Sequence, residues 1–262
     1  MKTLDLISNL RRNPSEFQDR VSAILSVRWE SSFGSRPAYP SVGVEKGMEF
    51  LLGTLGRSFA NALDEPQLAQ IEKNVSKRQD ELPKNAPFAK FHNGDTLLGR
   101  LCYAVARSIR PKTVIETGVC YGVTSAFVLA ALEVNEQGHL YSIDLPPLGK
   151  NGDDYVGWLV PNELQHRWTL RRGTSRRLLG PLVESLGPID LFVHDSLHTY
   201  KNMKKEFENA WPALRPGGIL ISDDIEGNAA FLQLAQSKEL GRSVVIQEKN
   251  KGALLGVAVK RR

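Results

Sequence analysis

The 262-residue sequence has few cysteines, no long apolar run and no internal repeat. Its two cysteines, Cys102 and Cys120, show no CxxC spacing and have no further partners, which argues against a disulfide framework and a cysteine-rich zinc site. No stretch reaches the roughly 18 apolar residues that span a membrane, and the N-terminus lacks the apolar core of a secretory signal. We therefore expect no membrane association, no secretion and a reducing, cytoplasmic setting.

A dense basic run with interleaved aromatic residues is also missing. The formal net charge is +5, but the basic residues are spread over "LRRNPSEFQDR", "RWTLRRGTSRR" and the terminal "KRR". Such a distribution is typical of a solvated surface and argues only weakly for attraction to acidic partners. Nucleic acid is therefore not the partner we expect.

Residues 1–92 are predicted to form a helical and irregular N-terminal extension. Apolar residues recur at three- and four-residue spacing within 15–29, 47–63 and 66–82, and segments rich in Gly, Pro and Ser separate these stretches. Such helices can cover a functional site, form a dimer face, or do both. We expect a homo-oligomer.

Residues 93–262 alternate strand patterns with helix patterns. A helix that ends before Pro111 leads into five strand-then-helix units, whose strands are "TVIETGV", "HLYSIDL", "WTLRRG", "IDLFVHD" and "GGILISDDI". The chain then ends in a hairpin, "SVVIQEK" and "ALLGVAVK" around the turn "NKG". This order predicts an α/β fold with a doubly wound, mostly parallel, Rossmann-like sheet of seven strands, the last one antiparallel.

Ligands of open α/β sheets bind beyond the carboxyl ends of the strands. The first strand ends in "VIETGVCYG", where Gly118 and Gly122 allow a sharp turn and a close approach of the backbone to a ligand. The spacing E-x-G-x-x-x-G departs from the G-x-G-x-x-G of dinucleotide sites. A tight turn between a buried strand and a helix is the alternative explanation.

The second strand ends in Asp144, where an acid can accept hydrogen bonds from both hydroxyls of a ribose. An acid in such a loop can also cap a helix or face water. Asp144 alone therefore leaves both roles open.

These residues, together with "RRGTS", "IDLFVHDSLHTY" and "LRPGGILISDD", resemble the class I S-adenosylmethionine (SAM)-dependent methyltransferases over about residues 95–262. The resemblance implies that the glycine loop contacts the methionine part of SAM and that Asp144 holds the ribose. It implies Thr174 and Ser175 near adenine, because "RRGTSRR" contains no carboxylate. The cofactor-binding residues implied in this way are Glu116, Gly118, Tyr121, Gly122, Ser125, Asp144, Thr174, Ser175 and Asp195.

Three carboxylates are expected to meet at neighbouring strand ends. Asp195 closes the fourth strand, and Asp223 and Asp224 end the fifth. Because adjacent strands lie about 5 Å apart, these acids can converge, and their mutual repulsion calls for protons or a cation. An oxygen-rich set of this kind suits Mg²⁺ or Ca²⁺.

The same stretch resembles the metal-dependent sugar O-methyltransferases of the macrocin type, in which such aspartates hold Mg²⁺ and a D-x-D-x-Y pattern carries the general base. This chain has "DSLHTY" instead, with His198 near the position of the base. An imidazole that titrates near neutral pH can take a proton from a hydroxyl. Backbone binding by the aspartates and a structural role for the histidine are the alternatives, and His194 is expected in the interior.

A long segment, residues 146–168, separates the second and third strands. Its aromatic residues Tyr155 and Trp158, with His166, can line an acceptor pocket or fold back onto the domain. The two possibilities stay open.

The sequence thus predicts transfer of a methyl group from SAM to a hydroxyl of a small molecule, such as a sugar or another natural product. Asp195 and His198 are the predicted catalytic residues, and Asp195, Asp223 and Asp224 are the predicted metal ligands. An RNA methyltransferase and a SAM-binding regulatory protein without catalysis are the alternative functions.

Overall fold

A mixed eight-stranded sheet forms the centre of the protein. The computed structural model describes residues 10, 13–88, 96–149, 151–248 and 252–262. The strand order is β1-β7-β8-β6-β5-β2-β3-β4, and β8 alone runs antiparallel to its neighbours. The strands are β1 (Val42–Gly43), β2 (Thr113–Thr117), β3 (His139–Asp144), β4 (Trp168–Arg172), β5 (Ile189–His194), β6 (Leu214–Ser222), β7 (Leu240–Gln247) and β8 (Leu254–Lys260).

The predicted doubly wound fold with an antiparallel last strand is confirmed. The sheet has eight strands instead of seven, because Val42 and Gly43 pair in parallel with Ile246 and Gln247 of β7. Two residues are too few to show a strand periodicity, so the sequence pattern did not reveal β1. The predicted hairpin turn falls partly on residues 250 and 251, which lie outside the described residues.

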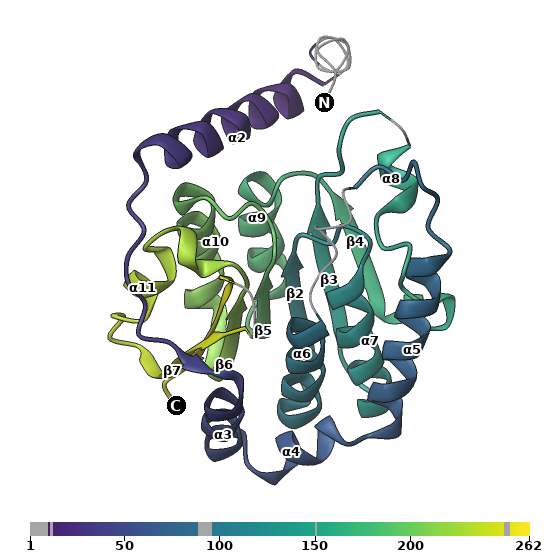
Figure 1. The fold of residues 1–262 in the computed structure, drawn as a ribbon, viewed down its shortest axis with the longest axis vertical. Helices are drawn as coiled ribbons and strands as arrows, with labels where there is room; N and C mark the ends of the chain where they lie inside the picture. The colour runs from purple at the N-terminus through teal and green to yellow at the C-terminus, as the bar shows by residue number, and fades with distance from the viewer. Residues whose placement is uncertain (1–9, 11–12, 89–95, 150, 249–251) are drawn as a thin grey trace.

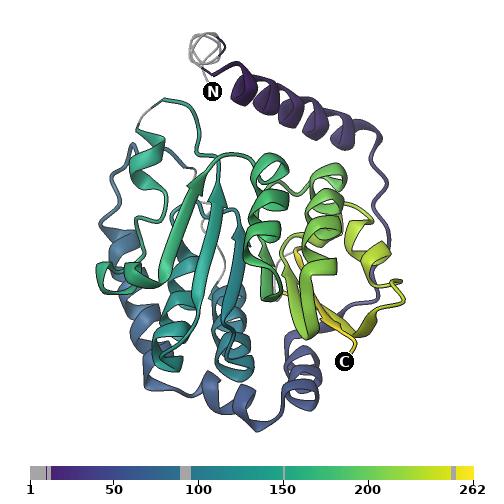
Figure 2. The same ribbon diagram turned by 180° about the vertical axis from the view of Figure 1, so that it is seen from behind.

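Helices cover both faces of the sheet (Figures 1 and 2). Helices α5, α6 and α7 lie on one face, and α9, α10 and α11 lie on the other. None of the described helices is both long and apolar enough to cross a membrane. The bounds of the longer helices are α2 (Pro14–Phe33), α3 (Val44–Leu55), α4 (Arg57–Leu63), α5 (Pro66–Asp80), α6 (Thr96–Ile109), α7 (Val123–Asn135), α9 (Ser175–Leu186) and α10 (Tyr200–Ala213), and the shorter segments are α8 (Gly152–Tyr155), η2 (Asn162–Arg167), η3 (Ile225–Gly227) and α11 (Ala230–Leu234).

Two apolar layers explain why the central strands are almost continuously hydrophobic. Val114 of β2 packs with α6 and α7, whereas its neighbour Ile115 packs with α9 and α10. Strands of a parallel sheet are buried on both faces, so both sets of alternate side chains must be apolar. The charged residues of these strands therefore lie at or next to the strand ends.

The N-terminal residues continue the domain and also extend over it. Helices α3, α4 and α5 pack against β7, α6 and α7, respectively. Helix α2 instead lies across the edge of the sheet where the parallel strands end (Figure 1). The predicted boundary between residues 92 and 93 falls within 89–95, outside the described residues.

Candidate active site

The loops that follow β2 to β6 meet beneath α2 and enclose a cavity of about 830 Å³. This volume lies within the roughly 300–1,000 Å³ typical of small-molecule sites. Eight of the predicted site residues line it: Gly118, Asp144, Thr174, Ser175, Asp195, His198, Asp223 and Asp224.

Backbone hydrogen bonds hold these loops side by side beyond the ends of the strands. The N–H of Asp195 donates to the carbonyl of Thr117 at 2.9 Å, and the N–H of Asp223 donates to the carbonyl of His194 at 3.0 Å. Each bond extends the ladder between neighbouring parallel strands. The predicted convergence of residues from separate strands therefore follows from the order of β2, β5 and β6.

The two glycines of the first loop are required by neighbouring parts of the chain. Gly118 has a φ of +84°, and a Cβ there would lie 1.9 Å from the carbonyl oxygen of Asp195. Gly122 has a φ of +89°, and its Cβ would lie 2.8 Å from the Cα of Gly157. Gly118 also contributes to the wall of the cavity, whereas Gly122 packs against the segment that follows β3. Close backbone packing is thus the first reason for this motif.

Asp144 is nearly buried and fixes the glycine loop from the end of β3. Its Oδ2 accepts the N–H groups of Val119 at 2.6 Å and Cys120 at 2.8 Å. Burial raises the pKa of this carboxyl, although the two N–H groups and the nearby Arg20 favour its ionised form. The carboxylate is therefore held in one orientation at the wall of the cavity.

Glu116 lies behind the loop, fully buried and away from the cavity. Its Oε2 accepts hydrogen bonds from the hydroxyls of Ser125 at 2.6 Å and Ser142 at 2.7 Å, and its Oε1 has no partner among the described residues. Burial raises the pKa of Glu116 to about 7. Tyr121 is also buried, and its hydroxyl bonds the backbone of Phe88. Glu116 and Tyr121, which were predicted to bind the cofactor, thus support the glycine loop from the protein interior.

His198 lies between two acids in the wall of the cavity. Its Nε2 is 3.9 Å from Oδ1 of Asp195 and 3.9 Å from Oδ2 of Asp224. Burial, followed by the charge of Asp223, raises the pKa of Asp195 well above its usual range.

The three aspartates share one cavity without forming a preformed metal site. Within the part of the chain that the structure describes, no three His, Cys, Asp or Glu side chains converge closely enough to hold a metal ion. Asp195, Asp223 and Asp224 are therefore not gathered around one point that could hold Mg²⁺ in this structure.

A buried hydrogen-bonded pair beneath the cavity, His194 and Glu206, was not anticipated from the sequence. As predicted, His194 is fully buried, but its Nδ1 lies 2.7 Å from Oε2 of Glu206 on α10. Oε1 of Glu206 accepts hydrogen bonds from the Ser196 hydroxyl at 2.7 Å and from Nδ2 of Asn202 at 2.9 Å. Although burial opposes ionisation, the charge and hydrogen bond of His194 lower the pKa of Glu206 to about 2.

The sequence does contain a signal that Glu206 is buried. Glu206 falls within the apolar stripe of α10 that includes Met203, Phe207 and Ala210, all of them buried. A charged residue at such a position must find a partner in the interior. Its hydrogen bonds anchor Ser196 and Asn202, which line the cavity.

Helix α2 provides a further wall of the cavity through Asp19, Arg20, Ala23 and Ile24. Arg20 donates from Nη2 to the carbonyl of Pro146 at 2.7 Å, and the Thr174 hydroxyl donates to Oδ2 of Asp19 at 3.0 Å. An additional ion pair joins Glu16 to Arg172 of β4 at 2.6 Å. Polar contacts thus tie α2 to the loops after β3 and β4, and they place an N-terminal helix at the site.

The segment between β3 and β4 packs outside the cavity. The ring of Tyr155 contacts Tyr121 and Trp158, with centroids 6.5 Å and 5.4 Å away, respectively. His166 lies 3.2 Å from Glu133 of α7. None of Tyr155, Trp158 and His166 lines the 830 Å³ cavity.

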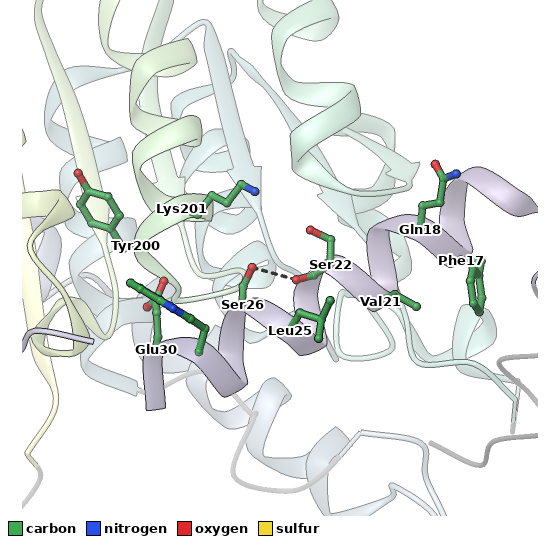
Figure 3. A pocket seen from close by; sticks show the side chains of 10 residues that line it. Phe17, Gln18, Val21, Ser22, Leu25, Ser26, Glu30, Tyr200 and Lys201 are labelled. Atoms are coloured by element: carbon green, nitrogen blue, oxygen red, sulfur yellow. Dashed lines mark hydrogen bonds between the residues drawn. The ribbon is translucent and has the colours of Figure 1, made fainter. Parts of the chain in front are cut away.

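A second hollow of about 570 Å³ lies between α2 and the beginning of α10 (Figure 3). Phe17, Val21, Leu25 and Trp29 give it a mainly apolar lining. None of the predicted site residues lines this hollow, so the strand-end cavity is the candidate active site.

Comparison with known proteins agrees with this geometry. A family model described as a methyltransferase domain matches residues 115–225. The match begins in β2 and ends after β6, so it contains the strand ends that line the cavity, whereas α2 lies outside it.

Solved methyltransferase structures share the fold of this domain. The O-methyltransferase TomG of tomaymycin synthesis from Streptomyces achromogenes, solved with SAM, is 16% identical, with a TM-score of 0.56 over 76% of this chain and 91% of its own. The O-methyltransferase from Bacillus cereus, solved with S-adenosylhomocysteine (SAH), is 16% identical, with a TM-score of 0.55 over 75% and 91%. An SAH-bound methyltransferase from Podospora anserina is 12% identical, with a TM-score of 0.53 over 94% and 96%. No curated protein matches the chain.

Proposed function

We propose that this protein transfers a methyl group from SAM to a hydroxyl of a small molecule. The observation that carries the proposal is the single cavity lined by the loops after β2 to β6, whose walls include Asp144, Asp195 and His198. The cofactors bound to the structurally similar O-methyltransferases support SAM as the cofactor. The size of the cavity supports a small acceptor.

The loop residues are arranged to bind and orient the cofactor. Asp144 already uses Oδ2 for the glycine loop, which leaves Oδ1 to accept hydrogen bonds from ribose hydroxyls. The backbone at Gly118 is proposed to contact the methionine part. Thr174 and Ser175 are proposed near adenine, where the hydroxyl of Thr174 is held by Asp19.

His198 is proposed to remove the proton from the acceptor hydroxyl. SAM, when bound, supplies an electrophilic methyl group on a sulfonium. The Nε2 of His198 can accept the hydroxyl proton, and the carboxylate of Asp224 at 3.9 Å then stabilises the imidazolium. The main task of the protein is to align the acceptor oxygen with the methyl group.

Cofactor binding is tested by isothermal titration calorimetry with SAM and with NAD. We expect binding of SAM, and we expect Asp144→Asn to weaken it by roughly tenfold or more, since a hydrogen bond to a charged group contributes about 1.5–3 kcal/mol. Asp154→Asn, an exposed acid of α8, is the matched control and should leave the affinity unchanged. Tight NAD binding without a response to SAM would overturn the assignment.

The base is tested with His198→Ala. We expect the turnover number to fall by roughly 10²- to 10⁴-fold, the usual contribution of a general base, while the affinity for SAM stays within about twofold. A rate near that of the wild type would remove His198 from the mechanism.

We further propose that Mg²⁺ assists the reaction and that the protein is a homo-oligomer in the cytoplasm. EDTA followed by added Mg²⁺ should abolish and then restore turnover if the aspartates gather around a cation when substrates bind. Indifference to both treatments would leave His198 and the carboxylates as the whole of the catalytic machinery.

A further inference from the structure

A third cavity, of about 520 Å³, opens between α2 and the first turn of α10. We call it the basic annex, after the cationic residues in its lining, Arg176, Lys201, Lys204 and Lys205. The annex and the candidate active site share Asp19, Ala23, Thr174, Leu197 and Asn202 as walls. One ligand can therefore extend from the strand ends into the annex.

The cations of the basic annex are not neutralised by the fold. Within the described residues, no carboxylate forms an ion pair with any of the four, and the Nζ of Lys204 lies 5.6 Å from the centre of the Tyr200 ring. The lining contains two acids, Asp19 and Glu208. Asp19 is already engaged by Arg177 and by the Thr174 hydroxyl. The annex therefore has a positive balance that favours an anion.

The first turn of α10 adds to this positive character. Thr199 is the N-cap residue, but its side chain makes no capping hydrogen bond. It lines the annex and is only 4% exposed, and its hydroxyl oxygen has no hydrogen-bond partner among the described residues. The N-terminus of a helix carries free N–H groups and a partial positive charge. A buried hydroxyl without a partner, beside such a helix end, is suited to a ligand oxygen.

Helix α2 forms the opposite wall. Figure 3 shows Lys201 across from Ser22 and Ser26 of α2. The hydroxyl of Ser26 donates to the carbonyl of Ser22 at 2.9 Å. An anion held by α10 would thus lie next to the helix that also covers the candidate active site.

We propose that the basic annex binds a phosphate group of the methyl acceptor, so that the acceptor is a small phosphorylated molecule. The proposal rests on the proposed function for the identity of this ligand as the acceptor. A phosphate monoester carries a charge of about −1.5 to −2 and three acceptor oxygens, which matches four cations, helix N–H groups and a hydroxyl better than a carboxylate does. A cavity between two helices fits a small molecule, whereas RNA requires an extended basic groove.

Binding of the anion is tested by calorimetry of the full chain with inorganic phosphate. We expect wild-type protein to bind phosphate and the double variant Lys201→Ala/Lys204→Ala to bind it at least tenfold more weakly. Lys73→Ala, an exposed lysine of α5, should bind as the wild type does. Equal binding by the double variant and the wild type would overturn the proposal.

Thr199→Val separates ligand binding from folding. The hydroxyl that it removes has no partner in the fold, so the unfolding temperature should stay unchanged. Phosphate binding should weaken by roughly tenfold, because a hydrogen bond to a charged group is lost. Unchanged phosphate affinity in this variant would contradict the role of Thr199.

The identity of the ligand is tested with pairs of hydroxyl compounds that differ only in a phosphate monoester, with methyl transfer followed as SAH production. We expect at least tenfold higher kcat/KM for the phosphorylated member, and loss of this preference in the double variant with unchanged affinity for SAM. Phosphate binding without such a preference would refute the acceptor assignment. Single-stranded RNA that binds at physiological salt and is released by the double substitution would replace the small molecule by a nucleic acid. Phosphate binding without SAM binding would instead refute the proposed function and leave the anion site in place.

Discussion

The buried pair of His194 and Glu206 offers a quantitative test of how the floor of the candidate site is held. Glu206→Gln preserves the shape of the side chain but removes its charge. A pKa of about 2, against the ordinary 4.5, corresponds to about 3 kcal/mol of stability at neutral pH. We therefore expect the free energy of unfolding to fall by about 3 kcal/mol at pH 7.

The pH dependence distinguishes the charge of Glu206 from simple packing. Because the pKa of Glu206 is lowered in the folded protein, its contribution is present above pH 4.5 and is lost as the pH falls toward 2. Because proton binding and folding are linked, the difference in free energy of unfolding between the wild type and Glu206→Gln should be smaller at pH 3.5 than at pH 7 by roughly 1.4 kcal/mol. Loss of packing would instead give the same difference at both pH values.

The measurement is urea unfolding of the wild type and of Glu206→Gln at both pH values, followed by circular dichroism. Glu184→Gln, an exposed acid of α9, is the control and should change stability by less than about 0.5 kcal/mol. A loss below about 1 kcal/mol at pH 7, or a loss that does not change with pH, would show that Glu206 is not ionised as described.

Two further predictions concern the glycine loop. Gly118→Ala should lower the free energy of unfolding by about 3 kcal/mol or more, because φ is +84° and the new Cβ would lie 1.9 Å from the Asp195 carbonyl oxygen. The control is Gly53→Ala in α3, where a Cβ would meet open space. In the same urea titration this control should be neutral or stabilising. Burial raises the pKa of Glu116 to about 7, so the folded protein disfavours the ionised carboxylate. Between pH 4.5 and pH 8, the free energy of unfolding of the cofactor-free wild type should therefore fall by about 3 kcal/mol relative to that of Glu116→Gln, whose side chain stays neutral. A pH-independent difference between these two proteins would refute the raised pKa.

Local sequence patterns predicted most of the central domain. The strands that include Val114 and Ile115 and the helices between them follow from short-range periodicity, and periodicity depends only on neighbouring residues. The parallel order then brings Asp144, Asp195 and Asp223 to one edge of the sheet. The sequence therefore predicted that the site lies at the carboxyl ends of the parallel strands.

Other features depend on which elements pack together across long distances in the chain. Asp19 and Arg20 line the cavity because α2 lies over the strand ends, and no pattern within residues 14–33 specifies that position. Glu116 is close in sequence to the loop but faces the interior, where two serine hydroxyls bind it.

The sequence by itself determined the order of strands and helices and the acids that end the strands, because these depend on local periodicity and composition. Only the tertiary structure decided that His194 pairs with Glu206 and that Gly118 is required by the backbone of Asp195. The physical reason is that burial, pKa and close contact are set by the partner a residue meets in space, and that partner is usually distant in the chain.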